Sequence, residues 1–319
     1  MHVLVTGGAG FIGSHLVAAL VREGHRVRVL DDMSTGSREN LAGLLDDVEL
    51  LIGDAADPQA ASRAVAGVEA LFHEAALPSV ARSVADPARS HLAAATATLT
   101  LLEAARQAGV RRFIYAGSSS AYGNARRLPK HEAMLPRPRS PYAAAKLAGE
   151  HYVHVYAQLH GLEALSLRYF NVFGPRQRGD SPYSGVISRF IADLWAGRAP
   201  VLHGDGLQSR DFTYVDNVVH ANLLALRAPG LTGQAVNVAT GRRITLRALL
   251  RLLGEALERP VAAQRAAPRA GDVRHSQADL RLAAKLLGYR PIVGFEEGLR
   301  RTVQWYRESS PQGRPECAA

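Results

Sequence analysis

The sequence has almost no cysteine and no long apolar run. Of its 319 residues only Cys317 is a cysteine, so no internal disulfide can form, which fits a reducing compartment such as the cytoplasm. No apolar run reaches the ~18 residues that a membrane-spanning helix needs. Glycines interrupt the apolar start at residues 3–10, and no basic flank precedes it, so a signal peptide is not expected. We therefore expect a cytoplasmic protein with no membrane partner.

Internal repeats, low-complexity segments and nucleic-acid-binding motifs are also missing. The composition is 47% hydrophobic and 21% charged, which suits one large domain or two joined lobes around a sizeable core. The net charge is +9, but the arginines are spread along the chain rather than clustered. We attribute this charge to an arginine-rich composition. Attraction of an anionic substrate would be a secondary effect, and no nucleic-acid partner is expected.

Short β-type runs alternate with helical patterns through the first half of the chain. Strands are expected at residues 2–5, 26–30, 70–73, 112–116 and 164–168, and helices at 11–22, 93–108 and 140–159. This alternation predicts βαβ units, and so an α/β fold with a Rossmann-type, doubly wound parallel sheet. After about residue 170 shorter elements follow: helices at 185–196, 216–226, 245–257 and 295–307, and strands at 201–203 and 235–239.

A glycine-rich segment lies directly between the first expected strand and the first expected helix. It carries Gly7, Gly10 and Gly13, each three residues from the next. Gly7 suits a tight turn, Gly10 lets the backbone approach a pyrophosphate, and Gly13 lets the helix pack close to the strand. The N–H groups of the helix N-terminus would then face the phosphates, so the segment predicts a dinucleotide site.

An acidic residue follows where a dinucleotide-binding unit needs one. Asp31 stands 18 residues after Gly13, at the end of the second expected strand, where it would bind the adenosine ribose hydroxyls. A carboxylate there repels a 2′-phosphate, so NAD is favoured over NADP as the cofactor.

We therefore expect two lobes with different tasks. Residues 1–170 would form an NAD-binding domain, with a return to its sheet around residues 212–240. Residues 171–211 and 241–308 would form a smaller C-terminal α/β substrate lobe. Residues 309–319 are expected to be a disordered tail.

A tyrosine and a lysine share one face of the expected helix 140–159. Tyr142 and Lys146 are four residues apart, which brings both side chains to the same face. A phenol has a pKa near 10, and a neighbouring ammonium lowers that pKa, so the pair can exchange a proton with a substrate hydroxyl. Alone, such a pair is usually an ordinary surface feature. The run Ser118-Ser119-Ser120, just after strand 112–116, favours the catalytic interpretation because it places hydroxyls at the same sheet edge.

With these motifs the chain resembles the extended short-chain dehydrogenases, the NAD-dependent epimerase/dehydratase family, over nearly its whole length. The resemblance rests on the glycine motif, the Tyr-x-x-x-Lys pair, the serine-rich strand end and Arg168-Tyr-Phe-Asn171. Within the family, the chain is most similar to bacterial UDP-N-acetylglucosamine and UDP-glucose 4-epimerases.

The resemblance implies roles for particular residues. Tyr142 would take the proton from the sugar 4-hydroxyl, Ser118 would hydrogen-bond the same oxygen, and Lys146 would hold the nicotinamide ribose. Further cofactor contacts would come from Phe11, Ile12, Asp32, Asp54, Ala55, Ala75, Ala76 and Tyr169. The nucleotide sugar would be contacted by Ser118, Ser119, Tyr142, Asn171, Arg210, Arg269, Asp272 and Ser276.

Arginines suit the diphosphate because guanidinium groups bind phosphate oxygens in pairs. Asp216, in contrast, is interpreted as a helix N-cap. No metal site is expected.

The two positions after Ser118 distinguish members of this family. Its dehydratases and decarboxylases carry a Glu there, whereas this chain has Ser119 and Ser120. The resemblance therefore implies 4-epimerisation through a transient 4-keto sugar, with NAD regenerated in each turnover. Seven residues after Arg269, the small Ser276 resembles the type that leaves room for an N-acetyl group. This favours UDP-GlcNAc and UDP-GalNAc, while UDP-Glc, UDP-Gal and UDP-glucuronate stay open.

Ala94 stands where the family usually has an Asn near the cofactor, which would weaken NAD retention or alter the geometry near the nicotinamide. Helices at the positions of 93–108 and 140–159 commonly pair across a dimer in the family, so a homodimer is expected. Two ordinary sheet-covering helices are the alternative.

Two other functions stay open. One is a nucleotide-sugar reductase, synthase or dehydratase of the same family. The other is a non-catalytic NAD-binding regulator or an RNA-binding protein on the same fold. Tyr142, Lys146 and Ser118 are all present, which favours an enzyme.

Overall fold

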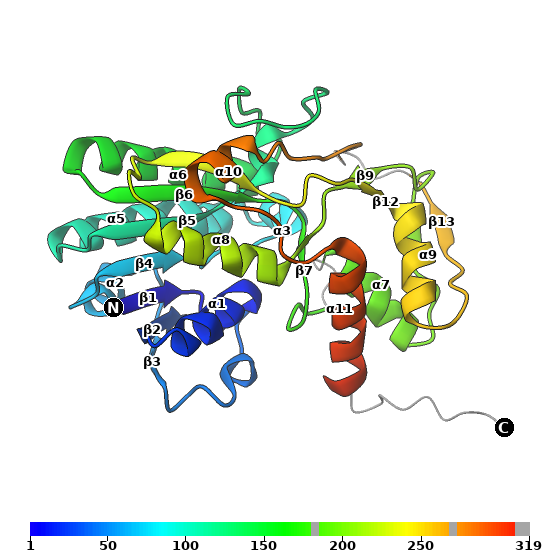
Figure 1. Ribbon diagram of the computed structural model, residues 1–319, viewed down its shortest axis with the longest axis horizontal. Coiled ribbons are helices and arrows are strands. Elements are labelled where there is room, and N and C mark those ends of the chain that lie inside the picture. Colours follow the sequence, from blue (N-terminus) through cyan, green and yellow to red (C-terminus); the bar gives the residue numbers. More distant parts are fainter. Residues whose placement is uncertain (180–184, 268–272, 310–319) are drawn as a thin grey trace.

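A seven-stranded sheet forms the centre of the computed structural model, which describes residues 1–179, 185–267 and 273–309 (Figure 1). The strand order is β11-β6-β5-β4-β1-β2-β3, and each neighbouring pair is parallel. The strands are β1 (His2–Thr6), β2 (Arg26–Asp31), β3 (Val48–Ile52), β4 (Ala70–His73), β5 (Arg112–Ser118), β6 (Glu163–Tyr169) and β11 (Gln234–Val238). The predicted doubly wound parallel sheet is confirmed.

Helices cover both faces of the sheet because its strands are apolar on both sides. Along β1, Val3 and Val5 pack with one set of helices and Leu4 with the other, and all three are fully buried. The first set is α1 (Phe11–Arg22), α8 (Val215–Arg227) and α10 (Arg281–Leu287). The second set is α2 (Pro58–Val65), α5 (Ala97–Gln107) and α6 (Pro141–His160). The sheet, including its C-terminal edge, therefore lies between two layers of helices.

The segment that leads into α5 is irregular. Two short helices, α3 (Val80–Ala85) and α4 (Pro87–His91), are followed by a π-helical turn at Leu92–Thr96. The expected helix 93–108 is thus present, but its first residues are wound more widely than an α-helix. Such π-turns are frequent at functional sites.

A smaller lobe lies beside the sheet (Figure 1). Its helices are α7 (Val186–Trp195), α9 (Leu246–Ala256) and α11 (Phe295–Ser309). Its strands form three short pairs: β7 (Val172–Phe173) with β10 (Thr213–Tyr214), β9 (Ser209–Arg210) with β12 (Ile244–Thr245), and β8 (Val201–His203) with β13 (Gln264–Ala266). Phe173, Phe212 and Phe295 are in mutual ring contact, with centroids 5.4–6.3 Å apart, at the centre of this lobe's own core.

The start of α8 and the end of α11 differ from the sequence-based expectation. Helix α8 begins at Val215 after Tyr214, so Asp216 lies in the first turn and is not the N-cap. Its carboxylate lies 3.4 Å from the Arg301 guanidinium instead, and a carboxylate in the first turn also favours the helix dipole. Helix α11 extends to Ser309, and residues 310–319 of the expected tail lie outside the described residues. Across the described ranges, none of the helices combines the length and apolarity needed to cross a membrane.

Candidate active site

The glycine-rich turn joins β1 to α1 at the C-terminal edge of the sheet. Gly7 has a φ of +67°, and a Cβ there would come within 2.7 Å of the Ala75 backbone. A Cβ at Gly13 would lie 2.1 Å from the carbonyl oxygen of Gly7, so α1 packs as close to the turn as glycine allows. Helix α1 starts after Gly10 without a side-chain cap. The backbone N–H groups of its first turn, which begins with Phe11 and Ile12, therefore remain available to phosphate oxygens.

Asp31 lies beside this turn, at the end of β2. Its Oδ2 accepts a hydrogen bond from the backbone N–H of Ala9 (2.9 Å), and its Oδ1 accepts one from Met33 (2.9 Å). Burial raises the pKa of Asp31, and these two hydrogen bonds partly offset that effect. Asp32 is exposed, and its Oδ1 accepts from the backbone N–H of Ser34 (2.9 Å). The structure thus places the ribose-binding candidate directly against the phosphate-binding turn.

The ends of β3 and β4 supply the other cofactor candidates. Asp54 and the buried Ala55 follow β3, and Asp54 Oδ1 accepts from the backbone N–H of Ala56 (2.8 Å). Ala75 and Ala76 follow β4, and Ala75 faces the glycine turn as described above. These residues therefore border the same edge of the sheet as the turn.

Ser118 and Tyr142 meet although they come from different elements. Ser118 ends β5, and Tyr142 lies in the first turn of α6, whose N-cap Ser140 accepts from the backbone N–H of Ala143 (3.2 Å). Burial raises the pKa of the Tyr142 phenol, and a hydrogen bond with Ser118 lowers it. Ser118 Oγ also lies 2.8 Å from Ser120 Oγ.

The expectation that Lys146 lowers the Tyr142 pKa is not met in this structure: burial of the phenol raises that pKa, and the Ser118 hydrogen bond is what lowers it. Ser119, the next residue after Ser118, is half-buried in the 3-10 turn Ser119–Tyr122. Two hydroxyls, those of Ser118 and Tyr142, therefore converge where a substrate oxygen would bind.

Lys146 is buried one turn further along α6. Its Nζ has no hydrogen-bond partner among the described residues and lies 4.3 Å from the centroid of the Tyr115 ring. Burial lowers the pKa of Lys146 to about 8, while the carboxylates of Glu74 and Glu150 raise it. Glu150 is itself held by Arg168, which donates two hydrogen bonds of 2.8 and 2.5 Å. The buried Lys146 ammonium is therefore an unused hydrogen-bond donor among the described residues.

The candidate substrate residues of the smaller lobe gather around β9. Arg210 donates to the carbonyl oxygens of Ser209 (3.0 Å) and Arg274 (3.4 Å). Ser276 is almost buried, and its backbone N–H donates to the same Ser209 carbonyl (3.0 Å). Asn171 has a φ of +36°, and its side chain donates to the carbonyl oxygen of Asp211 (3.0 Å). The other two substrate candidates lie outside the described residues: Arg269 and Asp272.

Known proteins with the same arrangement identify the family. Residues 3–239 match the NAD dependent epimerase/dehydratase family. The chain belongs to this family. A UDP-glucose 4-epimerase of Mycolicibacterium smegmatis is 40% identical over 97% of this chain and all of its own length.

Two solved structures extend the similarity to the whole fold. A UDP-N-acetylglucosamine 4-epimerase from Methanobrevibacter ruminantium, in complex with UDP-N-acetylmuramic acid, is 37% identical with a TM-score of 0.92. A UDP-glucose 4-epimerase from Thermotoga maritima, with UDP-glucose, is 39% identical with a TM-score of 0.92. Each of these two alignments covers 97% of this chain and 99% of the solved chain.

Membership of this family confirms the prediction that the cofactor is NAD. The residues present fit that cofactor. The turn at Gly7 and Gly13 has no room for side chains, Asp31 lies beside it, and the unpartnered Nζ of Lys146 can donate to ribose hydroxyls.

A buried histidine that the sequence analysis missed anchors this cofactor edge. His73 Nδ1 lies 2.8 Å from Thr6 Oγ1, and His73 Nε2 lies 3.0 Å from Thr98 Oγ1. Because Thr98 Oγ1 donates its only proton to the Ala94 carbonyl (2.6 Å), it must accept from His73, which assigns the proton to Nε2. Burial lowers the pKa of His73 well below its usual value, so the imidazole is neutral. The network ties β1 and β4 to α5.

Ala94 itself is buried in the π-helical turn and packs in a small cluster with Ala145 of α6. The Ala94 side chain therefore packs beside Ala145, which directly precedes Lys146. The consequence of lacking the family's usual Asn for NAD retention stays a prediction.

Glu74 is a second residue that the sequence analysis missed. Tyr169 donates a hydrogen bond to Glu74 Oε1 (2.7 Å), and Asn222 donates to the Tyr169 hydroxyl (2.8 Å). Burial raises the pKa of Glu74 to about 7, although Tyr169 and the Lys146 ammonium lower it. This half-buried acid therefore changes its protonation near neutral pH, close enough to Lys146 for the two charges to interact.

Replacing Glu74 by Gln should remove a pH dependence of stability. Because the folded-state pKa of about 7 exceeds the ordinary value of 4.5, the protonated form stabilises the fold. This contribution is fully present below about pH 4.5 and is lost as the pH rises through about 7. From pH 4.5 to 8 the variant should therefore gain about 3 kcal/mol in free energy of unfolding relative to wild type.

Urea unfolding at a series of pH values measures this difference. Glu255→Gln, which changes an exposed glutamate on α9, should follow the wild type at every pH. A constant difference between Glu74→Gln and wild type across this range would contradict the assignment.

Proposed function

We propose that this protein is an NAD-dependent UDP-sugar 4-epimerase whose preferred pair of substrates is UDP-GlcNAc and UDP-GalNAc. The observation that carries the proposal is the hydrogen bond between Ser118 and Tyr142, with the buried, unpartnered Lys146 Nζ one turn further along the same helix. The relatives named above are epimerases of UDP-glucose and UDP-N-acetylglucosamine, and they match this chain from end to end.

Each residue of this group has a distinct task in the proposed reaction. The NAD that the glycine turn and Asp31 would hold would supply reversible hydride transfer at C4 of the sugar. Tyr142 takes the proton of the 4-hydroxyl and later gives it back, and Ser118 holds the same oxygen by a hydrogen bond. Lys146 would supply a ribose contact and positive charge. This charge would favour the phenolate that Tyr142 needs before it can accept the proton, against the burial that raises its pKa.

The serines that follow Ser118 argue against the other reactions of the family. Ser119 and Ser120 carry no carboxylate, whereas the resemblance implies a Glu at this place in dehydratases and decarboxylases. Relatives with those activities are less similar: a dTDP-glucose 4,6-dehydratase of Streptomyces antibioticus is 32% identical, and a UDP-glucuronic acid decarboxylase 1 of Danio rerio is 29% identical. A UDP-glucuronate 4-epimerase of Thermodesulfobacterium geofontis is 31% identical, no more than the dehydratase. UDP-glucuronate is nevertheless the second candidate substrate, because that relative is also a 4-epimerase.

Replacing Ser276 by Tyr tests the choice of sugar. Ser276 is almost buried beside β9, so a tyrosine there would occupy the space that we assign to the acetamido group. We expect kcat/KM for UDP-GlcNAc to fall at least tenfold, a loss of about 1.4 kcal/mol, while kcat/KM for UDP-Glc stays within threefold. Ser276→Ala should preserve both activities. Equal losses for both sugars in the tyrosine variant would refute the specificity assignment.

We also propose a homodimer that pairs α5 and α6 of two copies. Three side chains on the outer side of α6 are apolar and exposed: Tyr152, Val155 and Leu159, the last at 71%. Leu159→Asp should shift the sedimentation coefficient from dimer to monomer. A wild-type protein that sediments as a monomer would exclude this assembly. The cytoplasmic location expected from the single cysteine stays a prediction.

A further inference from the structure

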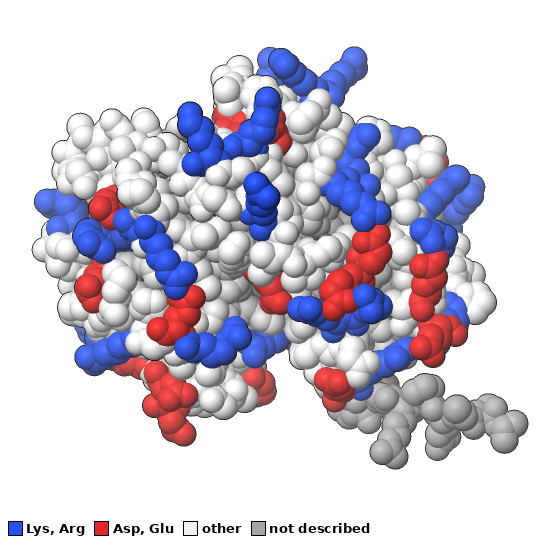
Figure 2. All heavy atoms as spheres, viewed as in Figure 1, with Lys and Arg blue, Asp and Glu red and all other residues white. Residues whose placement is uncertain are grey.

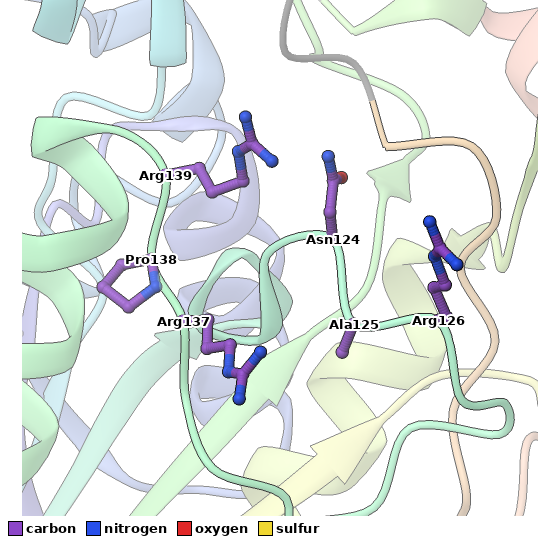
Figure 3. A pocket seen from close by; sticks show the side chains of 6 residues that line it. All are labelled: Asn124, Ala125, Arg126, Arg137, Pro138 and Arg139. Atoms are coloured by element: carbon purple, nitrogen blue, oxygen red, sulfur yellow. The ribbon is translucent and has the colours of Figure 1, made fainter.

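A hollow of about 580 Å³ lies next to the candidate active site (Figure 3). Two chain segments line it: Asn124, Ala125 and Arg126 on one side, and Arg137, Pro138 and Arg139 on the other. The arginines are spread along the sequence. The fold nevertheless brings three of them to one hollow.

The backbone of this hollow is fixed from below. Gly123 has a φ of +52°, and a Cβ there would lie only 2.0 Å from the Arg137 carbonyl oxygen, so the two segments are pressed together. The backbone N–H of Arg137 donates to the Ala121 carbonyl (2.8 Å). The buried Lys130 donates to the carbonyl oxygen of Ala125. The arginines therefore project from a preformed surface rather than from a loose loop.

The charge of the hollow is uncompensated. No acidic residue lines it, and within the described ranges no ion pair or hydrogen bond of the Arg126, Arg137 or Arg139 guanidinium is found. Figure 2 shows basic and acidic side chains interspersed over the visible face. Other arginines do have acidic partners, such as Arg274, which lies 2.7 Å from Asp205. Like charges held near one another repel, and a bound anion would relieve that repulsion.

The hollow also lies close to Ser118 and Tyr142 along the chain. Arg139 stands three residues before Tyr142, so their Cα atoms are at most about 11 Å apart. Asn124 follows Ser118 after a single 3-10 turn. Figure 3 shows the side chains of Asn124, Arg126 and Arg139 projecting to the same side, whereas Arg137 points away from them.

We propose that Arg126, Arg139 and Asn124 form an oxyanion site that takes a carboxylate or phosphate group next to the catalytic centre. Guanidinium groups bind such oxygens in pairs, the Asn124 amide adds a neutral donor, and Arg137 adds positive charge from behind. The anion is either an acidic substituent of the sugar held at Tyr142 or a separate small anion. Binding at this site does not depend on the epimerase proposal.

Calorimetric titration with inorganic pyrophosphate tests the site. The full-length protein is first saturated with NAD and UDP, so that the diphosphate-binding residues of the main cleft are occupied. We expect one pyrophosphate per chain, and at least tenfold weaker binding in the double variant Arg126→Gln/Arg139→Gln. A matched variant, Arg63→Gln/Arg290→Gln, removes two exposed arginines from other places and should bind within twofold of wild type. Equal affinity in the first variant, or an equal loss in both variants, would overturn the proposal.

Competition experiments then identify the source of the anion. In these experiments UDP-glucuronate or UDP-glucose replaces UDP in the saturating mixture. Displacement of pyrophosphate by UDP-glucuronate but not by UDP-glucose would support the site and assign it to the carboxylate of an acidic sugar. In that case the double variant should also raise the KM for UDP-glucuronate alone. Displacement by neither sugar would support a site for a separate anion. These outcomes stay readable even if no epimerisation is detected, because the readout is binding.

Discussion

Tyr142→Phe is expected to lower kcat for UDP-sugar epimerisation about 1000-fold while NAD and UDP affinities stay within threefold. The phenol oxygen is the group that meets Ser118 at the sheet edge, so its removal deletes the proton acceptor. Loss of a positioned general base costs about 10²–10⁴ in rate. The ring itself is retained, so the packing around α6 should not change.

Tyr152→Phe provides the control for this variant. Tyr152 lies on the same helix but is 38% exposed, and its substitution should leave kcat unchanged. Steady-state kinetics with calorimetric binding of UDP separates the chemical step from binding. A Tyr142→Phe enzyme that keeps more than a tenth of the wild-type kcat would exclude this phenol as the proton acceptor.

Gly13→Ala is expected to reduce NAD affinity on the order of 100-fold and to lower the free energy of unfolding by about 2 kcal/mol or more. The new Cβ would lie 2.1 Å from the Gly7 carbonyl oxygen and 2.8 Å from the Gly8 Cα. Neither atom can yield easily, because the Gly7 N–H donates to the Leu30 carbonyl (2.8 Å) and the turn packs on Ala75. The turn must therefore open, which moves the phosphate-binding N–H groups.

Gly294→Ala is the matched control for the glycine variant. A Cβ at Gly294 meets no atom within 4 Å, so this variant should unfold within about 1 kcal/mol of wild type and keep full NAD affinity. Urea unfolding and NAD titration provide both readouts. If Gly13→Ala bound NAD as tightly as wild type, the close approach of α1 to the turn would not be what forms the phosphate site.

The sequence predicts the long, apolar elements well and the short ones poorly. Helix α6 is predicted to within one residue at each end, because Ser140 caps its start and Gly161 adopts the left-handed conformation after its end. Strand β3 at the sheet edge was missed, because its side chains are only partly buried and the polar Glu49 interrupts the apolar run. The two-residue strands of the smaller lobe depend on tertiary packing and leave no local pattern.

The candidate site shows the same division. The spacing of Tyr142 and Lys146 and the position of Ser118 after a strand predict that these residues converge. Glu74 could not be found this way, because its raised pKa comes from burial in the folded chain, and its hydrogen-bond partner Tyr169 lies 95 residues away. His73 likewise acquires its fixed tautomer only when β1 and α5 bring two threonines to it. Burial and long-range partners, rather than residue type, define these two residues.

The most direct test of the central claim is proton NMR of UDP-GlcNAc incubated with the purified protein in D₂O, without added NAD. We predict conversion to UDP-GalNAc with the C4 proton retained, no deuterium at C4, and no net change in the reduced nicotinamide band. Retention of that proton shows that the hydride leaves and returns within one active site. Net accumulation of reduced cofactor, or no turnover of UDP-GlcNAc, UDP-Glc or UDP-glucuronate even after NAD is supplied, would contradict the account.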